Sequence, residues 1–153
     1  MRHLKQFQDF VNEGVVKRVA ADKERAKSLI KEADRKMKSL NEQLEKIGIK
    51  DENANDYVEY CYDIILNLIR AKLLVQGFSA TGQGAHEAEI SYLRELGFSE
   101  KDTMFADQLR YFRNGILYYG TSLDKEYADS VIKFQSRLCR KLKEVFKRDQ
   151  FMP

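Results

Sequence analysis

The sequence predicts an all-α protein, an up-and-down helical bundle of about five helices in which two long helices form an antiparallel hairpin and the others are shorter. Three observations support this prediction. Proline occurs only at Pro153. Apolar residues recur at steps of three and four, as on one face of a helix. Glycines follow four of these segments, at Gly48, Gly77, Gly97 and Gly120, where helices commonly end. Four ends imply five helical stretches.

The N-terminal segment is the first expected element. Within residues 2–13, Leu4, Phe7 and Val11 have helical spacing. We therefore expect a short leading helix that bends near Gly14.

The first long helix carries an apolar stripe with alternating steps of four and three. The stripe consists of Ala26, Ile30, Ala33, Met37, Leu40, Leu44 and Ile47. Because Ala26 and Ala33 are small, a partner helix can approach closely, which favours one arm of a hairpin. The second arm follows a polar link and spans residues 56–76, which are apolar on most of the circumference. This segment is the expected core helix.

Shorter helices follow the glycine-rich segment 79–84. Residues 86–98 form the first of them, and Ser99 with Asp102 provides a capping-box-like start for the next. The last helix runs from about residue 124 to residue 148. Its expected inner face consists of Val131, Phe134, Leu138, Leu142 and Val145.

Length and composition favour one domain over residues 1–153. No apolar run reaches the roughly 18 residues that a membrane span requires, and the first residues lack signal-peptide features, so we expect a cytoplasmic protein without membrane contact. Cys61 and Cys139 lie in apolar helical patterns and are expected to be reduced core thiols. The alternative is an intracellular disulfide of the kind found in hyperthermophiles.

The net charge of +3 is too small to indicate a nucleic-acid binder by itself. Its distribution is uneven, because residues 133–148 hold seven Lys or Arg against one acid, Glu144. Two interpretations remain open. The segment is either a solvated helix face whose cations complement the helix dipole, or a face that binds phosphates.

The segment RYFRNGILYYG, residues 110–120, has two different helical faces. The face assigned to the core consists of Phe105, Leu109, Phe112, Ile116 and Tyr119. The nearly opposite face consists of Arg110, Arg113, Asn114, Leu117 and Tyr118. Leu117 and Tyr118 are costly to expose side by side, and Gly115 costs roughly 1 kcal/mol of helix propensity. A second copy of the same helix is the simplest cover, with Gly115, Leu117 and Tyr118 in the dimer interface.

Such a dimer brings the arginines of two chains together, which is unfavourable unless anions intervene. Guanidinium groups bind phosphate in bidentate fashion, so we expect Arg110, Arg113, Asn114 and Tyr118 to form a phosphate-binding set. Alternatively, both arginines pair with acids of their own chain, such as Asp107 or Glu126, and merely fix the interface.

These features resemble the HEPN domain, a small all-α family named for an association with nucleotide binding. The resemblance rests on the order of the helices and on a helix with Arg113 and Asn114 followed by Tyr118, Tyr119 and Gly120. It implies a homodimer formed through this helix. It also implies one of three functions: nucleotide or RNA binding, metal-independent RNA cleavage of the toxin or defence type, or partnership with a minimal nucleotidyltransferase.

The family's ribonuclease signature places a histidine after the arginine, with four to six residues between them. Here Tyr118 or Tyr119 occupies that position, whereas Arg113 and Asn114 match. Tyrosine, with a pKa of about 10, is a poor base at neutral pH. The sequence therefore favours binding over catalysis, with Arg113, Asn114 and Tyr118 as the candidates if cleavage occurs.

Two histidines and a glycine pair lie outside this motif. His3 is near the terminus. His86 begins a helix, where we expect it to cap or pack and where the helix N-terminus disfavours the charged form of its ring. Gly82 and Gly84 resemble an anion-binding turn but lack the other P-loop residues. No metal-ligand cluster is evident, and we expect no cofactor.

Overall fold

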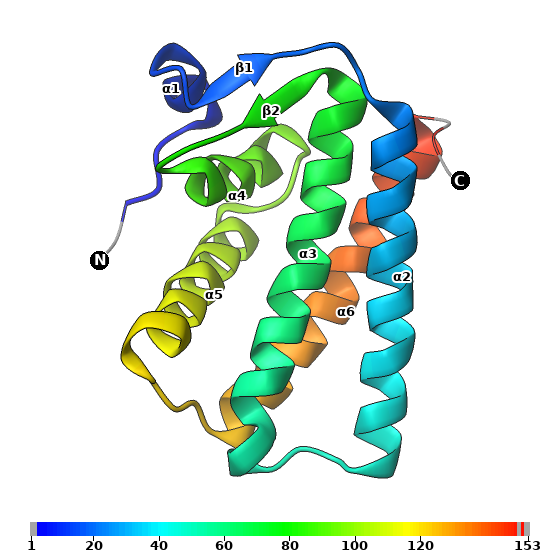
Figure 1. Ribbon diagram of the computed structural model, residues 1–153, viewed down its shortest axis with the longest axis vertical. Coiled ribbons are helices and arrows are strands. Elements are labelled where there is room, and N and C mark those ends of the chain that lie inside the picture. The colour runs from blue at the N-terminus through cyan, green and yellow to red at the C-terminus, as the bar shows by residue number, and fades with distance from the viewer. Residues whose placement is uncertain (1–2, 150, 152–153) are drawn as a thin grey trace.

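The computed structural model describes residues 3–149 and 151, and within these residues it contains six α-helices (Figure 1). They are α1 (Phe7–Asn12), α2 (Lys23–Lys46), α3 (Ala54–Gln76), α4 (Ala85–Glu95), α5 (Glu100–Tyr119) and α6 (Lys125–Arg148). The predicted helical bundle is confirmed, as is the long antiparallel pair, α2 and α3. Residue 2 and Pro153 lie outside the described residues.

The α2–α3 hairpin forms as the small residues predict. Ala26 and Ala33 of α2 are fully buried, and a short 3-10 turn at Asp51–Asn53 leads into α3. Helix α3 is covered on several sides, since it contacts α2, α4, α5 and α6. Its apolar circumference is thus explained by its central position.

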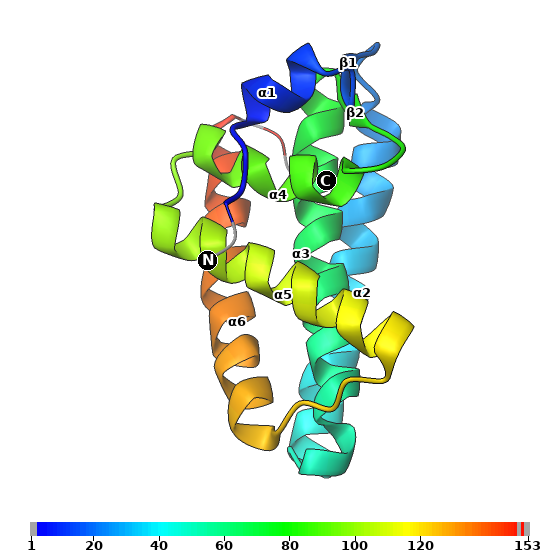
Figure 2. The same cartoon turned by 90° about the vertical axis from the view of Figure 1, so that its left-hand side faces the viewer.

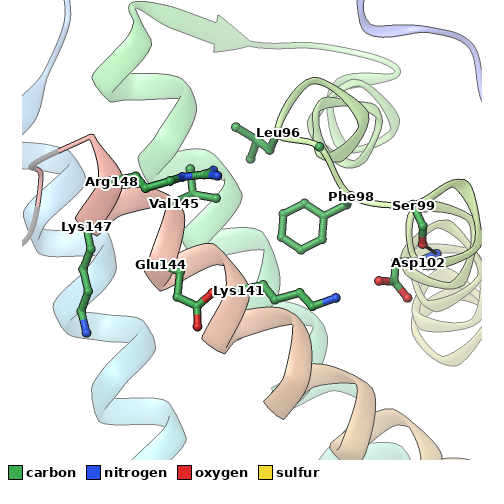
Figure 3. Close-up of a pocket in the computed structure, with 10 residues that line it drawn as sticks. Leu96, Phe98, Ser99, Asp102, Lys141, Glu144, Val145, Lys147 and Arg148 are labelled. Carbon is green, nitrogen blue, oxygen red and sulfur yellow. Dashed lines mark hydrogen bonds between the residues drawn. The ribbon is translucent and has the colours of Figure 1, made fainter.

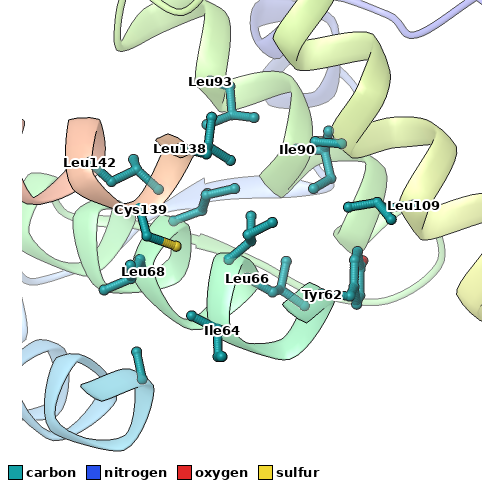
Figure 4. Close-up of a cluster of buried hydrophobic side chains, with 14 of the residues drawn as sticks. Tyr62, Ile64, Leu66, Leu68, Ile90, Leu93, Leu109, Leu138, Cys139 and Leu142 are labelled. Atoms are coloured by element: carbon teal, nitrogen blue, oxygen red, sulfur yellow. The ribbon is translucent and has the colours of Figure 1, made fainter. Parts of the chain in front are cut away.

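The main core lies where α3, α4, α5 and α6 meet (Figure 4). Leu68 of α3, Leu93 of α4, Leu109 of α5 and Leu138 of α6 are each fully buried there. The thiol of Cys139 belongs to the same cluster, and Cys61 and Cys139 are both free, as predicted.

Two short strands were not predicted. Strand β1 (Val16–Arg18) pairs antiparallel with β2 (Phe78–Ala80), with Val16 opposite Ala80. Three residues are too few to show an alternating pattern, so the sequence offered no strand signal. The pair fastens the N-terminal segment to the link between α3 and α4 (Figure 1). The leading helix is shorter than predicted, because it begins only at Phe7, and Leu4 enters the core from an extended segment before it.

Helix α5 begins where the capping residue predicts, because the hydroxyl of Ser99 accepts a hydrogen bond from the backbone N–H of Asp102 at 3.1 Å. It runs diagonally across α3, and its C-terminal end projects beyond its neighbours (Figure 2). The assignment of Tyr119 to the core is therefore wrong, since this side chain is 86% exposed. The helical period was right, but the core reaches only as far as Ile116, and the residues after it at the end of α5 are exposed.

The basic segment forms the outer face of α6. Several of its cations pair with acids, including Arg137 with Asp102 and Lys143 with Asp34. No helix among the described residues is long and apolar enough to cross a membrane.

Candidate phosphate-binding site

A cleft of about 510 Å³ lies between the N-terminus of α4 and one stripe of α5. Arg110, Asn114 and Tyr118 line it at steps of four residues, so they share one face of α5. The opposite wall is the segment from Gly82 to Glu87. The structure therefore brings together three predicted site residues with a loop that the sequence only weakly indicated.

Arg110 lies much deeper than predicted. Arg110 is only 5% exposed, because α3 and α4 enclose the first half of α5. The assignment of Arg110 to an outward face is therefore wrong. Its Nε donates to Asp107 Oδ1 at 2.8 Å, and its Nη1 lies 3.8 Å from Glu87 Oε1. The alternative in which this arginine pairs with Asp107 is confirmed. Even so, Nη2 is buried and has no hydrogen-bond partner within the part of the chain that the structure describes.

Arg113 is more accessible, with its side chain 25% exposed. It pairs with Asp63 of α3 at 3.8 Å rather than with Asp107 or Glu126. Its guanidinium lies 5.6 Å from the centre of the Tyr62 ring. Its Nε is also buried without a hydrogen-bond partner among the described residues. Two arginines on successive turns therefore each retain an unsatisfied donor.

His86, which was expected to cap or pack at the start of a helix, takes part in the cleft instead. It lines the same cleft, and its ring lies 6.4 Å from that of Tyr62, centre to centre. Burial lowers its pKa below the ordinary value; Glu89 opposes this shift, whereas the nearby charges of Arg70, Arg113 and Arg110 add to it. This shift favours the neutral form of His86. Its place at the start of α4, two residues after Gly84, is visible in the sequence.

The loop before α4 turns at two glycines, and the Ala85 N–H donates to the Gly82 carbonyl at 3.2 Å. Gly82 and Gly84 both have positive φ, +77° and +86°, a region that favours glycine. Gly84 is the N-cap of α4 and supplies no side-chain cap. Because the first amides of a helix lack intrahelical partners, this end of α4 offers N–H donors to the cleft.

The cleft is not uniformly positive. Glu87, with its side chain 38% exposed, lines it and lies near Arg110. The Nε of Arg110 already donates a hydrogen bond to Asp107. A bound anion would therefore use the remaining guanidinium donors and displace only the long contact to Glu87.

A second cleft, of about 410 Å³, adjoins the first and shares Gly82, Ala85 and His86 with it. Its wall includes a bidentate ion pair in which Arg70 donates to the buried Glu89 at 2.6 and 3.0 Å. His86 thus stands between two openings at the N-terminus of α4.

The predicted interface residues lie at the outer end of α5. Leu117 and Tyr118 are 51% and 75% exposed. A contact within the chain explains the glycine at position 115, because a Cβ there would stand 3.0 Å from Thr121 Oγ1. The same turn is held by the Thr121 N–H, which donates to the Gly115 carbonyl at 3.2 Å.

Within residues 3–149 and 151, no group of three or more His, Cys, Asp or Glu could hold a metal ion. No family model, curated protein or solved structure matches the chain.

Proposed function

We propose that the protein binds the phosphate of a nucleotide or of RNA in the cleft between α4 and α5. One observation carries this proposal: the guanidinium of Arg110 lines the cleft, is almost fully buried, and has an Nη2 without a partner in the described chain. A buried donor left unsatisfied costs about 1–3 kcal/mol. An anion in the cleft would remove that cost.

The surrounding groups suit a phosphate. Arg113, on the next turn, does not line the cleft, but its charge lies close enough to act on His86, and planar guanidinium groups match phosphate oxygens. Asn114 and Tyr118 supply neutral donors from the same stripe. The N-terminus of α4 contributes a favourable dipole.

Binding is tested by calorimetric titration with orthophosphate, adenosine monophosphate and a short single-stranded RNA. The variant Arg113→Gln removes the more accessible charge, and Arg35→Gln, an exposed arginine of α2, is the matched control. We expect a loss of affinity of about tenfold or more for Arg113→Gln and none for the control. Equal affinity of both variants would refute the proposal.

We also propose that the chain is a HEPN-like homodimer formed through the outer end of α5. Leu117, Tyr118 and Tyr119 are 51%, 75% and 86% exposed beside the cleft, and so large an apolar surface favours burial against a partner. In this arrangement two clefts lie next to the two-fold axis.

Light scattering at micromolar concentration tests the dimer. Leu117→Glu is expected to give a monomer. The control Val19→Glu changes a 43% exposed position remote in sequence from α5 and should leave the dimer intact. A monomeric wild-type protein contradicts this proposal without affecting phosphate binding.

A second candidate function, metal-independent RNA cleavage, is favoured by His86. Neutral His86 takes the proton of a 2′-hydroxyl, whose oxygen then bonds to the adjacent phosphorus. The bond from phosphorus to the 5′-oxygen breaks, and Tyr118 donates the proton that this oxygen needs. The products are a 2′,3′-cyclic phosphate and a 5′-hydroxyl, and solvent returns the two side chains to their starting states.

Cleavage of RNA in EDTA tests this candidate. His86→Gln and Arg113→Ala are both expected to abolish activity while the fold is retained. Activity that persists equally in both variants indicates a contaminating nuclease. Partnership with a nucleotidyltransferase, which the family resemblance implies, stays a prediction that co-purification would test.

A further inference from the structure

A larger pocket, of about 760 Å³, lies at the other end of α5 (Figure 3). Its walls are the link between α4 and α5, the first turn of α5 and the last turns of α6. None of its lining residues belongs to the cleft described above. Its volume is within the range of small-molecule sites.

One side of this pocket is apolar. Leu96, Phe98 and Val145 line it, and Figure 3 shows the ring of Phe98 between Leu96 and the side chain of Lys141. Phe98 is only partly buried, and its backbone is fixed by a hydrogen bond from its N–H to the Leu93 carbonyl at 3.1 Å. An aromatic ring is thus held at the pocket wall on a defined backbone.

The other side is cationic. Lys141, Lys147 and Arg148 line the pocket, and none of them forms an ion pair with another residue in the described part of the chain. In Figure 3 the side chain of Lys141 lies beside the Phe98 ring, that of Arg148 lies next to Val145, and Lys147 points away from the ring. These cations differ from other basic residues of α6, such as Lys133 and Lys143, which do pair with acids.

The acids of the pocket do not neutralise these cations. Arg137 engages both oxygens of Asp102 at 2.9 Å, which leaves Glu144 as the acid facing three cations of the lining. Beyond the lining, Lys72 pairs with Asp149, and burial lowers the pKa of Lys72, as does the charge of Arg148. The pocket therefore attracts anions.

We propose that this pocket binds a nucleotide unit, with its base stacked on Phe98 and its phosphate held by Lys141 and Arg148. Bases stack on aromatic side chains regardless of their sequence, and cations beside such a ring hold the backbone phosphate. An inorganic anion would leave the apolar side unused. This assignment favours the phosphate-binding interpretation for Lys141 and Arg148 of the basic segment, whereas Lys133, Arg137 and Lys143 pair with acids.

The test is an NMR titration of the labelled protein with adenosine monophosphate at low salt. We expect the methyl signals of Leu96 and Val145 to shift, and the Ala85 signal reports separately on the cleft between α4 and α5. Phe98→Leu keeps the apolar volume and removes the ring. It should weaken the nucleotide about tenfold and leave inorganic phosphate unchanged.

Arg148→Gln should weaken both probes, whereas the control Lys133→Gln, on the same helix but outside the pocket, should weaken neither. Comparison of the mononucleotide with an eight-nucleotide single strand separates two sources of this ligand. A stronger, salt-sensitive affinity for the strand assigns the site to RNA or single-stranded DNA, and equal affinity assigns it to free nucleotides.

The proposal is overturned if the signals of Leu96 and Val145 do not move at millimolar nucleotide. It is equally overturned if Phe98→Leu and Arg148→Gln bind the nucleotide as the wild type does. Because Ala85 reports on the other cleft, either failure is distinguishable from a failure of the function proposed above.

Discussion

Arg110 and Asp107 form a nearly buried ion pair within one turn of α5, with Nε 2.8 Å from Oδ1. The two residues are 5% and 2% exposed. The pair fixes the guanidinium at the wall of the cleft, while Nη2 stays buried and without a hydrogen-bond partner in the described chain. A residue that the sequence placed on the surface is therefore part of the structural support of the site.

Removal of this arginine should destabilise the fold. Arg110→Ala leaves the Asp107 carboxylate buried and without its charge partner, which costs about 3 kcal/mol or more. Urea unfolding measures the loss. The double variant Arg110→Met with Asp107→Leu removes both charges and should recover most of the stability. No recovery in the double variant would show that packing, rather than charge, accounts for the loss.

Gly77 should tolerate alanine much less than Gly48, although both have nearly the same φ, +80° and +79°. A Cβ at position 77 stands 2.9 Å from the Val19 carbonyl oxygen, whereas nothing lies within 4 Å at position 48. Gly48→Ala is expected to cost about 1 kcal/mol, the cost of the left-handed conformation alone. Gly77→Ala should cost clearly more in the same denaturation experiment, and equal losses would contradict the predicted clash.

Stability should depend on pH through His86. Its folded-state pKa is lowered, mainly by burial, so the unfolded chain binds a proton that the folded chain does not. The free energy of unfolding therefore falls as pH drops through about 6.5, the ordinary value for histidine. Urea unfolding between pH 7.5 and pH 5.5 tests this expectation. His86→Gln should show a shallower slope over the same interval; an unchanged slope would assign the effect to other groups.

The two thiols should be inert in the folded protein. Cys61 and Cys139 are fully buried, and burial raises the pKa of both, that of Cys139 to about 11. A thiol reagent such as DTNB at pH 8 is expected to react slowly with the native protein and to label both cysteines rapidly in denaturant. Fast labelling of the native protein would mean that the α3–α6 interface opens readily.

The sequence by itself determined the helices. Its glycines mark the helix ends, since Gly77 and Gly120 are the C-caps of α3 and α5 with left-handed φ. The small residues of α2 determined its close contact with α3, and the apolar circumference of α3 determined its central place. These features depend on local backbone conformation and on helical period, which a sequence displays directly.

The tertiary structure alone decided which side chains meet and how deeply they lie. A helical wheel places Arg110 beside Arg113, but it cannot show that α4 covers only the first half of α5. For the same reason it placed Tyr119 in a core that does not reach the last turn. Coverage of a helix depends on its neighbours in space, and the spacing of residues along one helix contains no information about them.

The sequence also could not show which residues lie near His86 and Phe98, for the same reason. His86 lies at the start of α4 and Arg110 in the middle of α5. Phe98 lies in the link before α5, and Lys141 lies near the end of α6. No local sequence pattern therefore connects either pair. The packing of α4 against α5 brings the first pair to one cleft, and the approach of α6 to the α4–α5 link brings the second to one pocket. Sequence determined the elements, whereas long-range packing assembled the two candidate sites.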